Sequence, residues 1–105
     1  MTKADFKFKK NLPYAFCISG HANYDDYGKD IVCSSITTAV FTTLNLLDKL
    51  LKKEDYTLFE DEDKGIIDFC LNIESELSST IIINLLDILK KIEEQYPRNL
   101  KINIK

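Results

Sequence analysis

The sequence predicts a two-layer α/β sandwich, in which two helices cover one face of a five-stranded sheet. Several short stretches alternate apolar with polar residues, which is typical of strands with one buried face. Two longer stretches instead repeat apolar residues every three or four positions, which is typical of amphipathic helices. The order along the chain is β-β-α-β-β-α-β, and two such helices can cover the apolar face of one sheet.

The first two predicted strands form a hairpin. Residues 5–9, "DFKFK", alternate apolar with charged side chains and place Phe6 and Phe8 on one face. Residues 11–13, "NLP", predict a turn. The second strand covers 14–19, "YAFCIS". Its two faces carry Tyr14, Phe16 and Ile18 on one side and Ala15, Cys17 and Ser19 on the other.

The first helix is predicted over residues 31–53. Its apolar stripe is Val32, Ile36, Val40, Leu44, Leu47 and Leu51. Asp30 precedes this stretch and suits the N-cap, because its carboxylate can accept hydrogen bonds from free amides of the first turn. The nearly uncharged stretch 31–45 is too short to span a bilayer.

The second half of the chain repeats the strand–strand–helix pattern and adds a strand. Residues 56–60 and 65–73 predict a second hairpin, and 74–96 predict a second helix between a Ser75 N-cap and Pro97. Residues 100–104, "LKINI", alternate again and predict the fifth strand. The expected stripe of the second helix is Leu77, Ile81, Leu85, Ile88 and Ile92.

Composition limits the classes of function that this chain can serve. Its 105 residues fit one domain, 1–105, and 45% of them are hydrophobic. A net charge of -3 argues against a surface that binds nucleic acid through bulk positive charge.

No apolar run follows Met1, so we expect a cytoplasmic protein. Three cysteines without CxxC spacing predict no disulfide framework, and Cys70 reads as a packing residue.

The chemically capable residues concentrate in 19–35, "SGHANYDDYGKDIVCSS". It holds His21, the one histidine of the chain, and Cys33. We expect Cys33 in the first turn of the first helix, where free amides and the helix dipole favour a thiolate and can hold an oxyanion. His21 would then be the base. The spacing alone favours a buried, inert cysteine and a solvated histidine over such a pair.

A metal site is the competing interpretation of the same stretch. Cys17, His21 and Cys33 could supply three ligands. The fourth could come from Asp25, Asp26 or Asp30. Zinc sites usually show closely paired ligands such as CxxC or HxxxH, and this stretch has neither. We therefore expect no metal and no cofactor.

The stretch "GHANYDDYGKDIVCSS" resembles the signature of the ribosomal-processing cysteine proteases, the Prp family. That signature is G-H-A, five residues, G-x-D-I-V-C and then small residues. The matching positions are Gly20, His21, Ala22, Gly28, Asp30, Ile31, Val32 and Cys33. Ser34 stands where alanine is usual. The ending "QYPRNLKI", 95–102, resembles the Tyr-Pro and final strand of the family, so the resemblance covers essentially the whole chain.

The resemblance implies a mixed sheet, a homodimer and a Cys–His dyad, with Cys33 as nucleophile and His21 as base. It implies removal of an N-terminal extension from a large-subunit ribosomal protein, by cleavage after an aromatic residue. Gly20, Ala22 and Gly28 belong to the loop motif. Asp30 would either orient His21 or cap the helix. The expected partner is the ribosomal protein precursor, with no membrane or direct nucleic-acid contact.

A second class of function stays open from the sequence. Small sheet-and-helix domains also serve as non-catalytic modules in ribosome assembly or protein binding, because a fold does not determine a function. Such a module would bind a partner without cleaving it, and alkylation of its thiols would not affect that binding.

Overall fold

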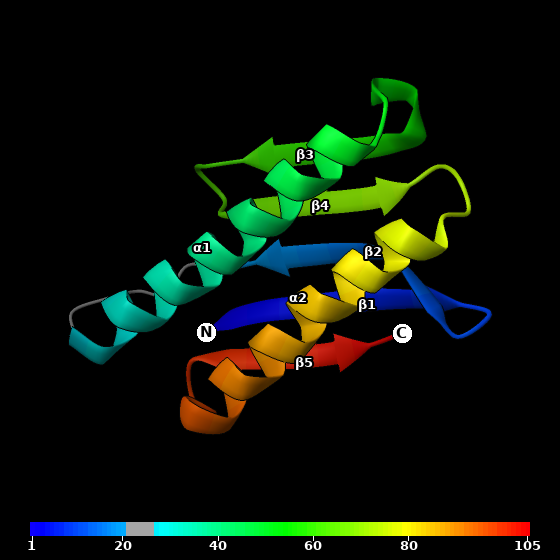
Figure 1. Ribbon diagram of the computed structural model, residues 1–105. Coiled ribbons are helices and arrows are strands. Elements are labelled where there is room, and N and C mark those ends of the chain that lie inside the picture. Colours follow the sequence, from blue (N-terminus) through cyan, green and yellow to red (C-terminus); the bar gives the residue numbers. More distant parts are fainter. Residues whose placement is uncertain (21–26) are drawn as a thin grey trace.

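The computed structural model describes the backbone of residues 1–20 and 27–105, and the side chains of residues 1–20 and 31–105. The strands and helices follow the predicted order, with one short 3₁₀-helix added after the first long helix (Figure 1). They are β1 (Thr2–Lys9), β2 (Leu12–Ser19), α1 (Tyr27–Leu50), η1 (Lys53–Asp55), β3 (Tyr56–Asp61), β4 (Ile66–Leu71), α2 (Glu76–Gln95) and β5 (Leu100–Ile104).

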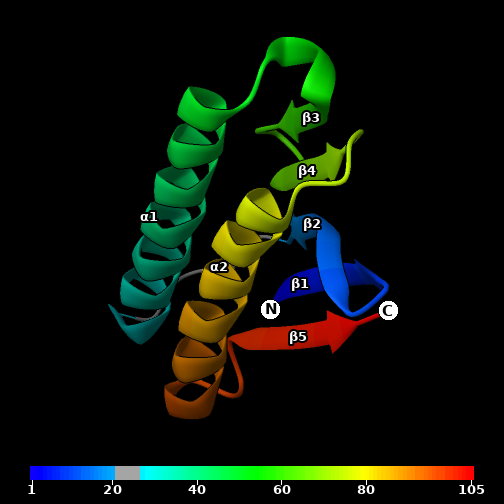
Figure 2. The ribbon, with the colours of Figure 1, turned by 45° about the vertical axis from the view of Figure 1, so that its right-hand side comes forward.

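The five strands form one mixed sheet in the order β3-β4-β2-β1-β5. β5 runs parallel to β1, and the other neighbouring strands are antiparallel. Both helices lie on the same face of the sheet, as Figures 1 and 2 show from two directions. The predicted two-layer sandwich is therefore confirmed.

A row of aromatic rings crosses the three central strands beneath the helices. Phe6 of β1 is the register partner of Phe16 of β2, which is in turn the partner of Phe69 of β4. The ring centroids are 5.9 Å apart for Phe6 and Phe16 and 5.2 Å apart for Phe16 and Phe69. Each side chain is at most 1% exposed. Because a one-residue slip would turn these rings outward, their burial specifies the strand register.

The turn between β1 and β2 differs from the predicted one. Lys10 and Asn11 form it, with φ of 54° and 67°, and Leu12 already belongs to β2. Two consecutive residues of positive φ are typical of a type I′ hairpin turn, which matches the twist of the flanking strands. Pro13 lies within β2, beside a register shift between Lys7 and Phe8. A proline is tolerated at such an irregularity because it has no N–H to donate.

The first helix begins earlier than the sequence predicts. α1 starts at Tyr27 and ends at Leu50, so Asp30 lies inside the helix and its prediction as N-cap is wrong. The Asp30 pattern did not mark the start of the helix, because a helix, once nucleated, gains one hydrogen bond for each added residue. It can therefore extend past an internal Asp. The predicted apolar stripe is confirmed within the helix, whereas Leu51 lies beyond the end of the helix at Leu50 and is only partly buried. The buried members of the stripe are Val32, Ile36, Val40, Leu44 and Leu47.

The apolar part of α1 is longer than the stretch 31–45 considered above. By length and composition, Ile31–Leu50 could cross a membrane, with 20 residues and a hydropathy of 1.4. In this structure the helix instead places its apolar stripe against the sheet and α2. A core helix passes the same test of length and composition.

The second helix buries a face that overlaps the predicted one only in part, at Leu85 and, partly buried, at Ile81 and Ile92. Its buried apolar residues are Ile82, Leu85, Leu86 and Leu89, whereas Leu77 and Ile88 are exposed. Ser78 and Ser79 are also buried, and the Ser79 hydroxyl donates a 2.8 Å hydrogen bond to the carbonyl of Pro13 in β2. These small side chains let α2 approach the sheet closely. Ser75 is the N-cap as predicted, and accepts from the Ser78 amide.

Replacing Leu89 should test the corrected face, because Leu89 was not in the predicted stripe. Leu89 is 0% exposed and Leu77 is 59% exposed. Leu89→Ala should lower the free energy of unfolding by about 2–5 kcal/mol, because it leaves a cavity in the core. Leu77→Ala should change it by less than about 0.5 kcal/mol. Urea denaturation followed by circular dichroism measures both, and equal losses would contradict the observed face.

Candidate active site

The side chain of Cys33 is positioned by the buried stripe of α1. Val32, Ile36 and Val40 point into the core, and each is at most 4% exposed. Consecutive helical residues are about 100° apart around the axis, so the next residues along share the edge of that buried face. Those residues are Cys33, Thr37 and Phe41. They form one row, half-buried at Cys33 and exposed further along.

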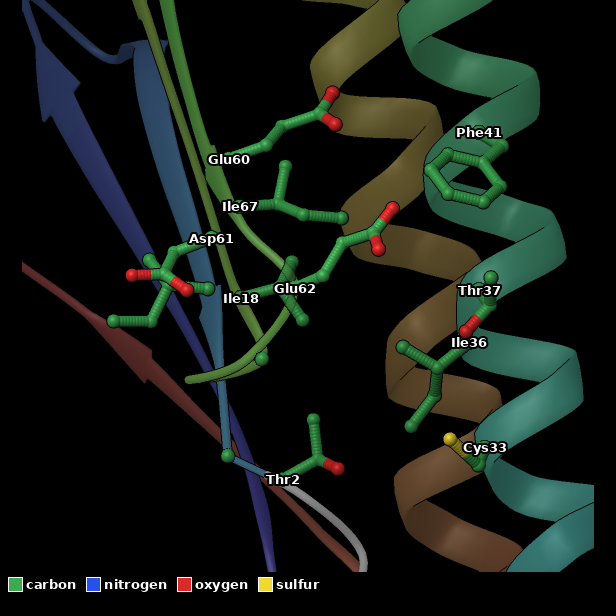
Figure 3. Close-up of a pocket in the computed structure, with 13 residues that line it drawn as sticks. Thr2, Ile18, Cys33, Ile36, Thr37, Phe41, Glu60, Asp61, Glu62 and Ile67 are labelled. Atoms are coloured by element: carbon green, nitrogen blue, oxygen red, sulfur yellow. The ribbon is translucent and has the colours of Figure 1, made fainter.

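This row forms one wall of a groove between α1 and the β3–β4 hairpin. The groove has a volume of about 200 Å³. Figure 3 shows Cys33, Thr37 and Phe41 on one side, with Glu60 and Glu62 of the hairpin reaching toward α1 from the other. The floor is mostly apolar and includes Thr2, Ile18, Ile36 and Ile67. α1 packs chiefly against α2, which leaves its hairpin side open. We call this the α1–hairpin groove.

Cys33 does not lie in the first turn of its helix. It is the seventh residue of a helix that begins at Tyr27. Only the first four amides of a helix lack a partner within the helix, so the amide of Cys33 is not free to bind an oxyanion. The effect of the helix dipole also falls off beyond the first turn. Both expectations based on a first-turn position are therefore wrong, although the thiol itself does open into the groove (Figure 3).

Gly20 also lines this groove, and its backbone strongly favours glycine. Its φ is +96°, a conformation that side chains rarely adopt. A Cβ built at Gly20 would lie 2.6 Å from the carbonyl oxygen of Met1. The signature glycine thus has a structural reason, which is the close approach of the Met1 carbonyl, just before β1, to the backbone that follows β2.

Several predicted site residues lie outside the part that the structure describes. His21 and Ala22 fall in the undescribed segment 21–26. Gly28 and Asp30 lie in the first turns of α1 by their backbone, and their side chains are outside the description. The roles assigned to His21, and to Asp30 as a residue that orients it, therefore stay predictions.

The other two cysteines lie on the opposite face of the sheet from the groove. Cys17 pairs with Asp5 and Asp68 across neighbouring strands, while its neighbours Phe16 and Ile18 point into the core. Burial raises the pKa of the Cys17 thiol, and the charges of Asp68 and Asp5 raise it further. Cys17 is therefore held as a neutral thiol.

Cys17 and Cys33 cannot share a metal ion, because the sheet separates them. Within the described residues, no group of three His, Cys, Asp or Glu side chains is placed to hold a metal. The zinc ligand set considered from the sequence therefore cannot contain both Cys17 and Cys33. Cys70 is half-buried on the same outer face as Cys17, and its thiol lies 3.5 Å from the carbonyl oxygen of Leu71. The assignment of Cys70 as a packing residue stays a prediction.

Sequence reasoning missed the wall that the hairpin contributes. Glu60 and Glu62 follow each other closely in "YTLFEDEDKG", a stretch that predicts only a hairpin. Nothing local indicates that this hairpin faces Cys33. Phe41 gave a weak signal, because it is apolar but falls outside the predicted stripe of its helix.

Comparisons with known proteins agree on one family. Residues 1–101 match the family model described as cysteine protease Prp. The ribosomal processing cysteine protease Prp of Bacillus subtilis is 31% identical over 93 residues, which cover 84% of this chain and 82% of that protein. Two crystal structures of the S. aureus protease superpose over the full length of both chains, one with a substrate peptide and one with a covalently linked product peptide. Their TM-scores are 0.87 and 0.86, at 23% and 25% identity.

Alanine at Gly20 should destabilise the protein. The substitution combines a strained φ with a clash against the Met1 carbonyl, so we expect a loss of about 1–3 kcal/mol in the free energy of unfolding. For a domain of this size the melting temperature should fall by at least about 4 °C. Thermal unfolding followed by circular dichroism measures this, and a melting temperature equal to that of the wild type would show that the constraint is not real.

Proposed function

The chain belongs to the cysteine protease Prp family and is a cysteine peptidase of the ribosomal-processing kind, and from this we propose the details of its reaction. It removes the N-terminal extension of a large-subunit ribosomal protein by cutting after an aromatic residue. A dyad of Cys33 and His21 carries out the cleavage. We prefer this proposal to the alternative of a non-catalytic module for ribosome assembly or protein binding, because the family is one of peptidases.

The observation that carries the proposal is the position of Cys33 in the α1–hairpin groove. Of the three cysteines, Cys33 alone lines this groove, whereas Cys17 and Cys70 lie on the outer face of the sheet. Gly20 also lines the groove, and His21 is the residue bonded to Gly20. This covalent link to a groove-lining residue supports His21 as the proposed partner of the thiol.

The proposed mechanism uses these two side chains in sequence. His21 takes the proton from the Cys33 thiol, and the thiolate sulfur attacks the scissile carbonyl carbon. The tetrahedral intermediate collapses as His21 gives its proton to the leaving amine, which breaks the peptide bond and leaves a thioester on Cys33. Water, deprotonated by His21, then attacks the thioester and releases the new carboxylate and the free thiol.

Three further elements of the proposal concern partners and setting. The partner is the precursor of the ribosomal protein, as the name of the Bacillus subtilis relative suggests. The protein works in the cytoplasm as a homodimer, without a cofactor and without direct contact to nucleic acid. Its net charge of -3 supports the last point, because ribosomal RNA would repel such a surface.

Cys33→Ala should abolish cleavage of the precursor and leave the fold intact. Cys33 is half-buried, so removing its sulfur should cost little stability compared with a core substitution. His21→Ala should slow cleavage by at least about a hundredfold, because the general base is lost. Gel electrophoresis of the precursor mixed with each variant measures the rate, and mass spectrometry of the product maps the cut.

Cys17→Ala is the matched control, because it removes a thiol on the other face of the sheet and should retain cleavage. Circular dichroism confirms that each variant is folded. Cleavage by folded Cys33→Ala would refute the assignment of the nucleophile. Failure of the wild type to cut the precursor would refute the proposed substrate.

A further inference from the structure

The α1–hairpin groove places acidic groups where the rest of the fold places apolar ones. Glu60 of β3 is the register partner of Ile67 of β4, and paired residues lie on the same face of a sheet. Ile67 packs against the core, so Glu60 also faces the helices. Elsewhere this inner face carries apolar side chains such as Phe6, Phe16 and Phe69. A carboxylate at this position needs a reason.

Two carboxylates are available for binding in the groove. Figure 3 shows that Glu60 and Glu62 both reach toward α1. Neither forms an ion pair or a side-chain hydrogen bond with any residue that the structure describes. Asp61 between them differs, because its carboxylate accepts the Lys64 amide at 3.1 Å and holds the turn. Glu60 and Glu62 are thus exposed charges without a structural task of this kind.

An aromatic ring lies on the wall across from them. Phe41 of α1 is 52% exposed, and it lines the groove two helical turns after Cys33. Lysine and arginine side chains lay their apolar stems on such rings, which also attract the cationic head. Carboxylates on the other side would pair with that head. Ring and carboxylates together suit a long cationic side chain better than either does alone.

From this geometry we propose that Phe41, Glu60 and Glu62 form a subsite for a lysine or arginine of the substrate. The assignment rests on the proposed function, since it names a substrate feature of the same groove. Phe41 follows Cys33 by eight residues, which is about 12 Å along a helix axis. An extended peptide advances about 3.3 Å per residue. The basic residue therefore lies within about four residues of the scissile bond.

The test is a positional scan with peptides that span the mapped cut in the precursor. Internally quenched peptides carry lysine, glutamine or glutamate at one position, from four residues before the scissile bond to four after it. The wild type should prefer lysine over glutamine in kcat/KM by about three- to tenfold at one or two adjacent positions. Glutamate should be the poorest, and the preference should weaken as salt is added.

Variants connect the preference to the named residues. In Glu60→Gln/Glu62→Gln the ratio of lysine to glutamine peptides should fall to about one at the preferred position. Phe41→Leu keeps the apolar volume but loses the ring, so it should reduce the ratio partly. Glu94→Gln is the matched control, because it removes an exposed carboxylate from α2, outside the groove, and should leave the ratio unchanged.

The outcomes separate this inference from the proposed function. If the wild type cuts the peptides with no preference for lysine, the function stands and the subsite is refuted. An equal preference at every position would reflect general attraction to an acidic protein, and would also refute it. If Glu60→Gln/Glu62→Gln retains the ratio but aggregates, the carboxylates protect the β3 edge from pairing instead. If no peptide is cut, the proposed function itself fails.

Discussion

The rotation of α1 about its own axis is the constraint on which the rest of the site depends. Val32, Ile36 and Val40 are buried in the core, and that burial determines where every other residue of the helix points. Cys33 follows Val32 directly, so it lies at the border of the buried face and opens into the α1–hairpin groove. A thiol on the buried stripe would be inaccessible, and one on the far side would have no wall opposite it. The same offset gives Thr37 and Phe41 their places along the groove.

The three cysteines of the chain lie in different surroundings because of where the sheet places them. Cys17 and Cys70 occupy the outer face of β2 and β4, where polar and charged side chains surround them. There, burial and the carboxylates of Asp68 and Asp5 raise the pKa of Cys17 and suppress its thiolate. Cys33 is on the helix side, with an open groove in front of it. The fold thus separates the thiol that lines the groove from the two thiols on the outer face of the sheet.

Local patterns predicted most of the fold because strands and helices have distinct periods. The five strands, the two helices and the stripe of α1 all follow from alternation or from spacing of three to four. The buried face of α2 did not, because this helix has apolar residues on two sides. Periodicity cannot choose between Leu77 and Ile82, whereas burial of Ser78 and Ser79 against β2 decides it. The start of α1 was missed because a plausible cap residue, Asp30, lies inside the helix.

Only the part of the candidate site that is contiguous in the sequence, around His21 and Cys33, could be predicted. Composition drew attention to Cys33 and His21, and the resemblance gave them roles. The opposite wall comes from Glu60 and Glu62, about thirty residues further along, and it meets Cys33 only because α1 packs on α2 and leaves the hairpin side open. No spacing rule carries that information.

The most direct test of the account is the rate at which iodoacetamide alkylates Cys33 between about pH 5 and pH 9. It requires Cys17→Ser/Cys70→Ser protein, with and without His21→Ala. The account predicts that loss of His21 slows alkylation near neutral pH by about tenfold or more. Superimposable pH profiles would contradict the dyad.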